Sequence, residues 1–87
     1  MLIRSQDKFS LVNIKNGTLI TSETGTISFH SISGYAVILG RYHERRKSIE
    51  VLDMIQEAHD AYERCKSVGG FQNIKTFQMP REEEDEQ

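Results

Sequence analysis

The sequence predicts an α+β fold class: an antiparallel β-meander of about four to five strands, one long amphipathic helix packed on it, and a candidate C-terminal strand. Three observations lead to this prediction. Residues 1–42 alternate short β-favouring runs with turn signals. From about residue 44 to residue 67, the apolar side chains instead follow the spacing of a helix. The stretch 71–79 is again β-favouring, and Pro80 ends it because proline cannot donate to a ladder.

The expected strands of the meander are short, and they occupy residues 2–5, 9–14, 18–22, 26–31 and 35–42. Between the second and the third, Asn16-Gly17 predicts a type I′ hairpin turn, because these residue types tolerate the positive φ that both central positions require. The last run is Tyr-Ala-Val-Ile-Leu-Gly-Arg-Tyr, which is apolar on both faces for most of its length. We therefore expect it to be the central strand of the sheet.

The predicted helix has one apolar face and one polar face. The side chains that fall within one arc and should pack on the sheet are Val51, Leu52, Ile55, Ala58, His59 and Tyr62. The polar side chains on the opposite face are Glu50, Asp53, Glu57, Asp60 and Arg64. The helix start at Glu44 lacks a Ser, Thr or Asp cap, so we expect it to fray, and Gly69-Gly70 ends the helix.

Length and composition predict a single domain over residues 1–80 and a disordered acidic tail over residues 81–87. The net charge is −2, but residues 1–80 carry 10 basic and 8 acidic side chains, so this body is nearly neutral at +2. The sequence contains one cysteine, Cys65, and it shows neither a signal-peptide pattern nor a stretch as long as a membrane span. These features predict a cytoplasmic protein without membrane attachment. A core this small also favours self-association.

Short motifs along the chain are shared with a group of small proteins. They are the opening Ile3-Arg4-Ser5-Gln6-Asp7, the segment Leu39-Gly40-Arg41-Tyr42 before the helix, Val51-Leu52-Asp53-Met54-Ile55 within it, and the closing Met79-Pro80. With these motifs the chain resembles a loosely defined group of small uncharacterised proteins from Gram-positive bacteria and their prophages. Lys8 stands where glycine is more usual in that group, and His43 where a small capping residue is expected. The resemblance suggests a mobile-element origin and implies no particular activity.

No residue pattern predicts a catalytic, cofactor or metal site. His30, His43, His59 and Cys65 are residue types that bind zinc, but no two of them have the close spacing of paired structural zinc ligands. We expect His59 at the edge of the buried helix face and Cys65 as a small buried hydrophobe. The helix C-terminus disfavours a thiolate at Cys65, which argues against a nucleophile there. The sequence therefore predicts a protein that is not an enzyme and has no cofactor and no metal.

One basic cluster lies across the end of the last strand of the meander and the start of the helix. Its residues are candidate contacts for nucleic acid or another anion, with the tyrosine as a stacking ring: Arg41, Tyr42, Arg45, Arg46 and Lys47. The alternative is a solvated helix start in which Arg45 and Arg46 pair with Glu50 and nearby acids. A body charge of +2 lacks the basic field typical of nucleic-acid binders. A small nucleic-acid-binding accessory protein is therefore the second functional hypothesis.

The first hypothesis is a non-enzymatic protein-interaction module, with a homodimer as its candidate assembly. An open meander leaves an edge strand whose unpaired amides and carbonyls invite another chain. Either the strand at 2–5 or the strand at 71–79 could pair with a second copy by β-addition, unless Lys8 or Lys75 protects that edge. The acidic tail is a further candidate contact for a basic partner, although physiological salt would screen its attraction.

Overall fold

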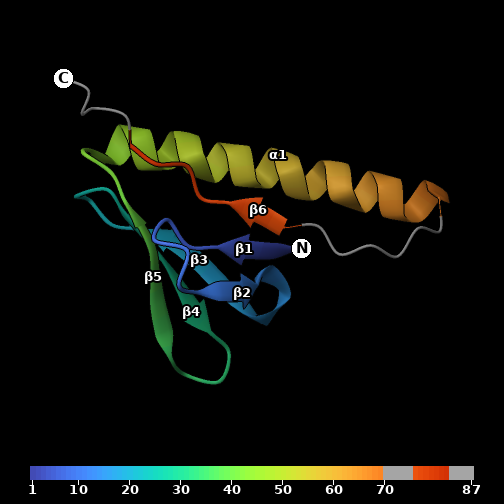
Figure 1. Ribbon diagram of the computed structural model, residues 1–87, viewed down its shortest axis with the longest axis horizontal. Coiled ribbons are helices and arrows are strands. Elements are labelled where there is room, and N and C mark those ends of the chain that lie inside the picture. The colour runs from blue at the N-terminus through green and yellow to red at the C-terminus, as the bar shows by residue number, and fades with distance from the viewer. Residues whose placement is uncertain (70–75, 83–87) are drawn as a thin grey trace.

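The computed structural model describes residues 1–69 and 76–82, and for residues 65–69 it describes the backbone alone. The elements in chain order are β1 (Leu2–Arg4), β2 (Leu11–Asn13), the 3-10 helix η1 (Ile14–Asn16), β3 (Gly17–Thr21), β4 (Thr26–Ser31), β5 (Ala36–Arg41), α1 (Arg45–Gly69) and β6 (Thr76–Gln78) (Figure 1). The predicted α+β fold class is confirmed.

Within the described residues, the strands form two three-stranded sheets instead of one continuous meander. The first sheet has the order β2-β1-β6 and the second has the order β3-β4-β5. Neighbouring strands are antiparallel except β1 and β6, which run parallel with Ile3 opposite Phe77. The predicted C-terminal strand is thus present as β6 over residues 76–78, whereas residues 71–75 of that prediction lie outside the described residues.

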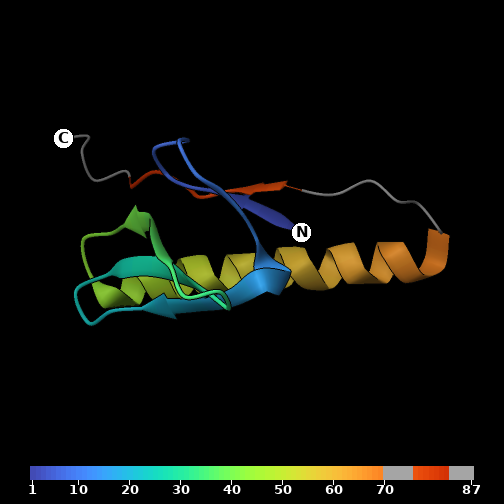
Figure 2. The ribbon, with the colours of Figure 1, turned by 90° about the horizontal axis from the view of Figure 1, so that it is seen from below.

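The core lies where the two sheets meet α1. Its buried side chains come from β1, β2, β4, β5, α1 and the segments that adjoin them: Met1, Ile3, Val12, Ile27, Phe29, Leu39, Tyr42, Val51, Ile55 and Met79. The predicted helix face is confirmed, since Val51 and Ile55 are buried, and Leu52, Ala58 and Tyr62 are partly buried. Figures 1 and 2 show both sheets beside the first half of α1, with its second half extending beyond them. No helix of the described residues combines the length and apolar character needed to cross a membrane.

The Asn16-Gly17 hairpin is a prediction that the structure corrects. Residues 14–16 form η1, where the Asn13 side chain accepts the Lys15 N–H at 3.0 Å, and β2 pairs with β1 rather than with β3. Gly17 is extended rather than left-handed, with φ 177°. A side chain at this position would overlap the carbonyl group of His30 on β4. The glycine therefore permits a close approach of two strands and does not form a turn.

The stretch 35–42 is at the edge of its sheet, and the prediction that it is central is wrong, because β4 is the middle strand. A β-bulge explains part of its apolar character. Ile27 lies opposite Gly40 and Ser28 lies opposite Ile38, so Leu39 is the extra residue on β5. Leu39 and Gly40 are consecutive and both buried, whereas Ile38 is exposed. Two consecutive residues are thus buried, which alternation along a regular strand with one exposed face would not allow, and Leu39 enters the core.

The strand at 2–5, predicted as a candidate edge, is also placed differently by the structure. β1 is the middle strand of its sheet, with β2 on one side and β6 on the other. Its backbone groups are therefore engaged by both neighbours and are not available for β-addition. β6, the other candidate, does lie at the edge of that sheet.

Candidate interaction surface

The basic cluster is dispersed over the surface where β5 ends and α1 begins. Arg41, Arg45 and Arg46 are exposed and Lys47 is half-buried. Glu44 pairs with Arg46 at 3.2 Å, and Glu50 lies 4.0 Å from Lys47. The pair of Arg46 with the nearby acid Glu44 is of the kind expected for a solvated helix start, whereas Glu50 lies beside Lys47 and not beside an arginine. Exposed ion pairs of this kind contribute little to stability.

Tyr42 does not fit the stacking role considered for it. Only 5% of this residue is exposed, and its hydroxyl donates to the carbonyl oxygen of Pro80 at 2.7 Å. Burial raises the pKa of Tyr42 to about 12, with a smaller contribution from the negative charge of Glu82. Tyr42 is therefore a core residue that anchors the chain after β6.

The first residues of the predicted tail contact the helix start. The backbone N–H of His43 donates to Oε2 of Glu82 at 2.6 Å. This carboxylate lies near the N-terminal end of α1, where the helix dipole favours negative charge. Glu82 thus places a negative charge beside the helix start, although the N–H that it accepts belongs to His43, which precedes α1. Residues 83–87 lie outside the described part of the chain.

The three histidines among the candidate zinc ligands lie on different segments of the fold. No group of three His, Cys, Asp or Glu side chains among the described residues could hold a metal ion. His59 is half-buried at the edge of the helix face, as expected, with Glu63 3.8 Å away. His30 is exposed on β4, where its Nε2 lies 3.1 Å from the hydroxyl of Ser28. The side chain of Cys65 falls outside the described residues.

The outer face of sheet β3–β4–β5 is free of charged residues over most of its width. Two rows of side chains cross it in register, namely Ile20, Ser28 and Ile38, and Thr18, His30 and Ala36. All are exposed except half-buried Ser28. Charged residues make up 28% of the chain, yet Glu23 is the one Asp, Glu, Lys or Arg between Asn16 and Gly40. Such depletion of charge is typical of the centre of a protein interface.

Part of the β5 edge carries unpaired backbone groups. Within the described residues, β5 has β4 on one side and no strand on the other. The N–H of Ser31 donates to the carbonyl of Tyr35 at 2.8 Å, so the next residue of β5 that bonds to β4 is Val37. The N–H and C=O groups of Ala36 and Ile38 therefore point outward. Edge strands are usually protected by charge or proline, and residues 35–40 contain neither.

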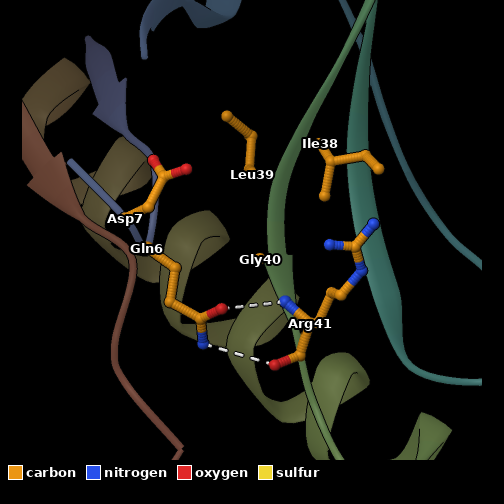
Figure 3. A pocket seen from close by; sticks show the side chains of 6 residues that line it. All are labelled: Gln6, Asp7, Ile38, Leu39, Gly40 and Arg41. Carbon is orange, nitrogen blue, oxygen red and sulfur yellow. Dashed lines mark hydrogen bonds between the residues drawn. The ribbon is translucent and has the colours of Figure 1, made fainter. Parts of the chain in front are cut away.

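Gln6 closes the rest of this edge. Its backbone N–H donates to the carbonyl of Leu39 at 2.7 Å. Its side-chain Oε1 accepts the N–H of Arg41 at 2.9 Å, and its Nε2 donates to the carbonyl of Arg41 at 3.3 Å (Figure 3). The same Nε2 donates to the carbonyl of Pro80 at 3.1 Å. One side chain thus joins β5 to the β1–β2 turn and to the segment after β6.

A pocket of about 140 Å³ opens beside Gln6, between the β1–β2 turn and β5. Figure 3 shows the residues that line it: Gln6, Asp7, Ile38, Leu39, Gly40 and Arg41. Oδ1 of Asp7 accepts the hydroxyl of Ser5 at 2.6 Å and the N–H of Phe9 at 2.9 Å. These two bonds, the hydroxyl first, lower the pKa of Asp7 and hold it as a carboxylate. Arg41 and Ile38 project on the other side of β5 from Asp7 (Figure 3).

The uncharged sheet face can be recognised from the sequence, whereas the pocket beside Gln6 cannot. The lack of charge between Asn16 and Gly40 is a compositional signal, which motif spacing does not reveal. The pocket is not visible in the sequence, because Asp7 and Leu39 meet through pairing between distant segments. Comparison of the chain with models of protein families, with curated proteins and with solved structures found no match. The functional proposal therefore depends on the surface itself.

Proposed function

We propose that the protein is a non-enzymatic interaction module that forms a homodimer by pairing of β5 with β5 of a second copy. The observation that supports this proposal is the position of β5. The strand is apolar on both faces, yet it lies at the edge of its sheet, where one face and part of its backbone edge are exposed to solvent. A strand of this kind is expected in the middle of a sheet. Pairing with a second copy would give it that position.

The chemistry of the surrounding face supports a protein partner. Large apolar side chains on and near β5 are exposed, with Ile32 at 81%, Tyr35 at 56% and Ile38 at 47%. The β4–β5 turn that carries the first two projects away from α1 (Figure 1). Burying such side chains against another protein contributes roughly 25 cal/mol for each Å² of apolar surface removed from water.

A second copy is the partner that fits this face most directly. An antiparallel pair of identical strands is compatible with two-fold symmetry, the commonest symmetry of soluble oligomers. A face with many charges of one sign would repel the same face of a second copy. The two rows of side chains on the outer face, which begin at Ile20 and Thr18, include no Asp, Glu, Lys or Arg. The lone cysteine is compatible with a reducing compartment such as the cytoplasm.

The nucleic-acid hypothesis has less support from the described residues. Glu44 and Glu50 lie beside the basic cluster, Glu82 lies at the adjoining helix start, and Tyr42 is buried. Arg41 and Arg45 remain exposed. Binding through them would be steeply dependent on salt, whereas association of an apolar sheet edge would not be.

The test is the solution mass of the pure protein over a series of concentrations at two salt levels. We expect the mass of a dimer at high concentration, with little effect of salt. Ile38→Glu should shift the equilibrium to monomer, because it places a carboxylate in the paired face. Met54→Glu is the matched control, since Met54 is also 47% exposed but lies on α1, and it should dimerise like the parent.

Two results would contradict the proposal. One is a monomer at the highest soluble concentration. The other is a dimer that Met54→Glu disrupts and Ile38→Glu leaves intact, which would assign the interface to α1. Circular dichroism of each variant shows that loss of the dimer does not reflect loss of the fold.

A further inference from the structure

Large and small side chains alternate on the outer face of sheet β3–β4–β5, both along the strands and across them. One row across the sheet is large, small, large, and consists of Ile20, Ser28 and Ile38. The neighbouring row is small, large, small, and consists of Thr18, His30 and Ala36. Each large side chain therefore has a small one beside it on its own strand and on the next strand.

A face with this pattern can pack against the same face of a second copy. When two sheets stack with their strands aligned, side chains of the two faces interdigitate across a layer about 10 Å thick. If the two-fold axis runs across the strands, the first row of one copy lies over the second row of the other. Ile20 then faces Thr18 of the second copy, and Ile38 faces Ala36. The central pair is Ser28 with His30, so every large side chain meets a small one.

The other aligned orientation, with the two-fold axis along the strands, opposes like with like. Each row then lies over itself, so that Ile20 faces Ile38 and His30 faces His30. Large side chains would collide while gaps remained between the small ones, and both faults are costly in a packed layer. The sizes of the side chains therefore favour the axis across the strands.

The polar groups of the face are also compatible with a second copy. Neither row includes Asp, Glu, Lys or Arg, so stacking opposes no like charges. In the single chain, Nε2 of His30 lies 3.1 Å from the hydroxyl of Ser28. Stacking places the same two residues of the second copy over this pair, so the polar atoms at the centre of the contact have partners there, as buried polar groups require.

We infer that two copies stack outer face on outer face, with the two-fold axis across the strands and Ile20 of each copy over Thr18 of the other. This inference goes beyond the proposed function, because the stacked contact leaves the β5 edge free. Six side chains on three strands cover roughly 14 Å by 14 Å, which is small beside the about 800 Å² per partner of a standard interface. The contact is therefore weak, and it adds a second step above the concentration at which β5 pairs.

Exchange of two side chains on β3 tests the stacked contact. Thr18 and Ile20 lie at the sheet edge away from β5, so changes there leave pairing through β5 intact. Thr18→Ile should weaken stacking, because it places a large side chain over Ile20 of the second copy. Ile20→Thr should weaken it too, because it leaves a gap over Thr18. The double variant Thr18→Ile/Ile20→Thr has the composition of the parent and again sets large over small, so it should stack like the parent.

Sedimentation equilibrium up to about 1 mM protein measures the dissociation constant of the stacking step. We expect each single variant to raise this constant about fivefold or more, since each change occurs twice in the contact, and the double variant to return it to within about twofold. Ile49→Thr is the matched control, because Ile49 is 42% exposed on α1 and Ile20 is 45% exposed. Circular dichroism of each variant checks that the fold is kept.

The outcomes separate stacking from pairing through β5. A parent protein that passes beyond the dimer, with weakened single variants and a restored double variant, supports the inference. A parent and variants that all remain dimers at about 1 mM overturn stacking and keep the β5 pair. A dimer that either single variant converts to monomer, and the double variant restores, supports stacking and overturns pairing through β5. A double variant weaker than both single variants overturns the orientation, and a monomeric parent overturns both proposals.

Discussion

The side chain of Gln6 forms with the backbone of Arg41 the two hydrogen bonds that the peptide group of a neighbouring strand would form. A third bond, from the same Nε2 to the carbonyl of Pro80, links the segment after β6 to this pair. Because the two sheets have no shared strand among the described residues, this amide is one of the direct polar links between them. Its removal should therefore affect the stability of the fold as a whole.

Gln6→Ala is expected to lower the free energy of unfolding by about 2 kcal/mol, because three hydrogen bonds contribute roughly 1 kcal/mol each and the site is partly exposed. Gln6→Glu should cost at least as much, since a carboxylate would face the carbonyls of Arg41 and Pro80. Urea denaturation measures both changes. Gln56→Ala is the control, an exposed glutamine of α1, and should change the free energy by less than about 0.5 kcal/mol. Equal effects at the two glutamines would contradict a linking role for Gln6.

Lys8→Gly is expected to stabilise the protein. Lys8 has φ 71°, which makes it the one non-glycine residue with positive φ in the described part of the chain. The left-handed region costs a side-chain-bearing residue about 1–2 kcal/mol, whereas glycine adopts it freely and loses part of that gain through its more flexible unfolded state. The net gain in the free energy of unfolding should be about 0.5 kcal/mol. Lys15→Gly, within η1, should instead destabilise the protein.

The parts of the fold that the sequence predicts are those with local causes. The helix face that includes Val51 and Ile55 follows from side-chain spacing alone, and β4 with buried Ile27 and Phe29 follows from alternation. Each of these features depends on residues a few positions apart, so the signal is contained in a short window.

The parts that were missed depend on contacts between distant segments. A glycine in a turn and a glycine that allows a close strand approach look alike in sequence, and Gly17 is the second kind. The parallel pairing of β1 with β6 joins residues more than 70 positions apart. For the candidate surface, a charge count over residues 16–40 would have indicated the uncharged face. The closure of the edge by Gln6 could not have been found in this way.

Glu82→Gln is expected to weaken the start of α1. The carboxylate accepts the N–H of His43 near the positive end of the helix dipole. Loss of its charge should lower the free energy of unfolding by about 0.3–1 kcal/mol at low salt, and less as salt screens the interaction. Glu57→Gln, at an exposed position in the middle of α1, is the control and should have a smaller effect. Thermal unfolding at two salt levels would measure the difference, and an effect of Glu82→Gln that grows with salt would be inconsistent with a charge–dipole interaction.

The buried hydroxyl of Tyr42 should make the protein sensitive to alkali. Burial raises the pKa of Tyr42 to about 12, and the charge of Glu82 adds to the rise, whereas a tyrosine in an unfolded chain titrates near pH 10. A raised folded-state pKa contributes stability that is complete below about pH 10 and is lost as the pH rises through about 12, because the unfolded chain releases its proton first.

Tyr42→Phe should remove this dependence and also cost about 1 kcal/mol at neutral pH, since the hydrogen bond to the carbonyl of Pro80 is lost. The measurement is the free energy of unfolding as a function of pH, together with the ultraviolet absorbance of tyrosinate. Glu82→Gln provides an independent check, because removal of that charge should move the titration of Tyr42 to lower pH while the ring stays buried. If the parent and Tyr42→Phe lost stability in parallel above pH 10, the alkaline transition would belong to other groups, and the buried hydroxyl would be excluded as its cause.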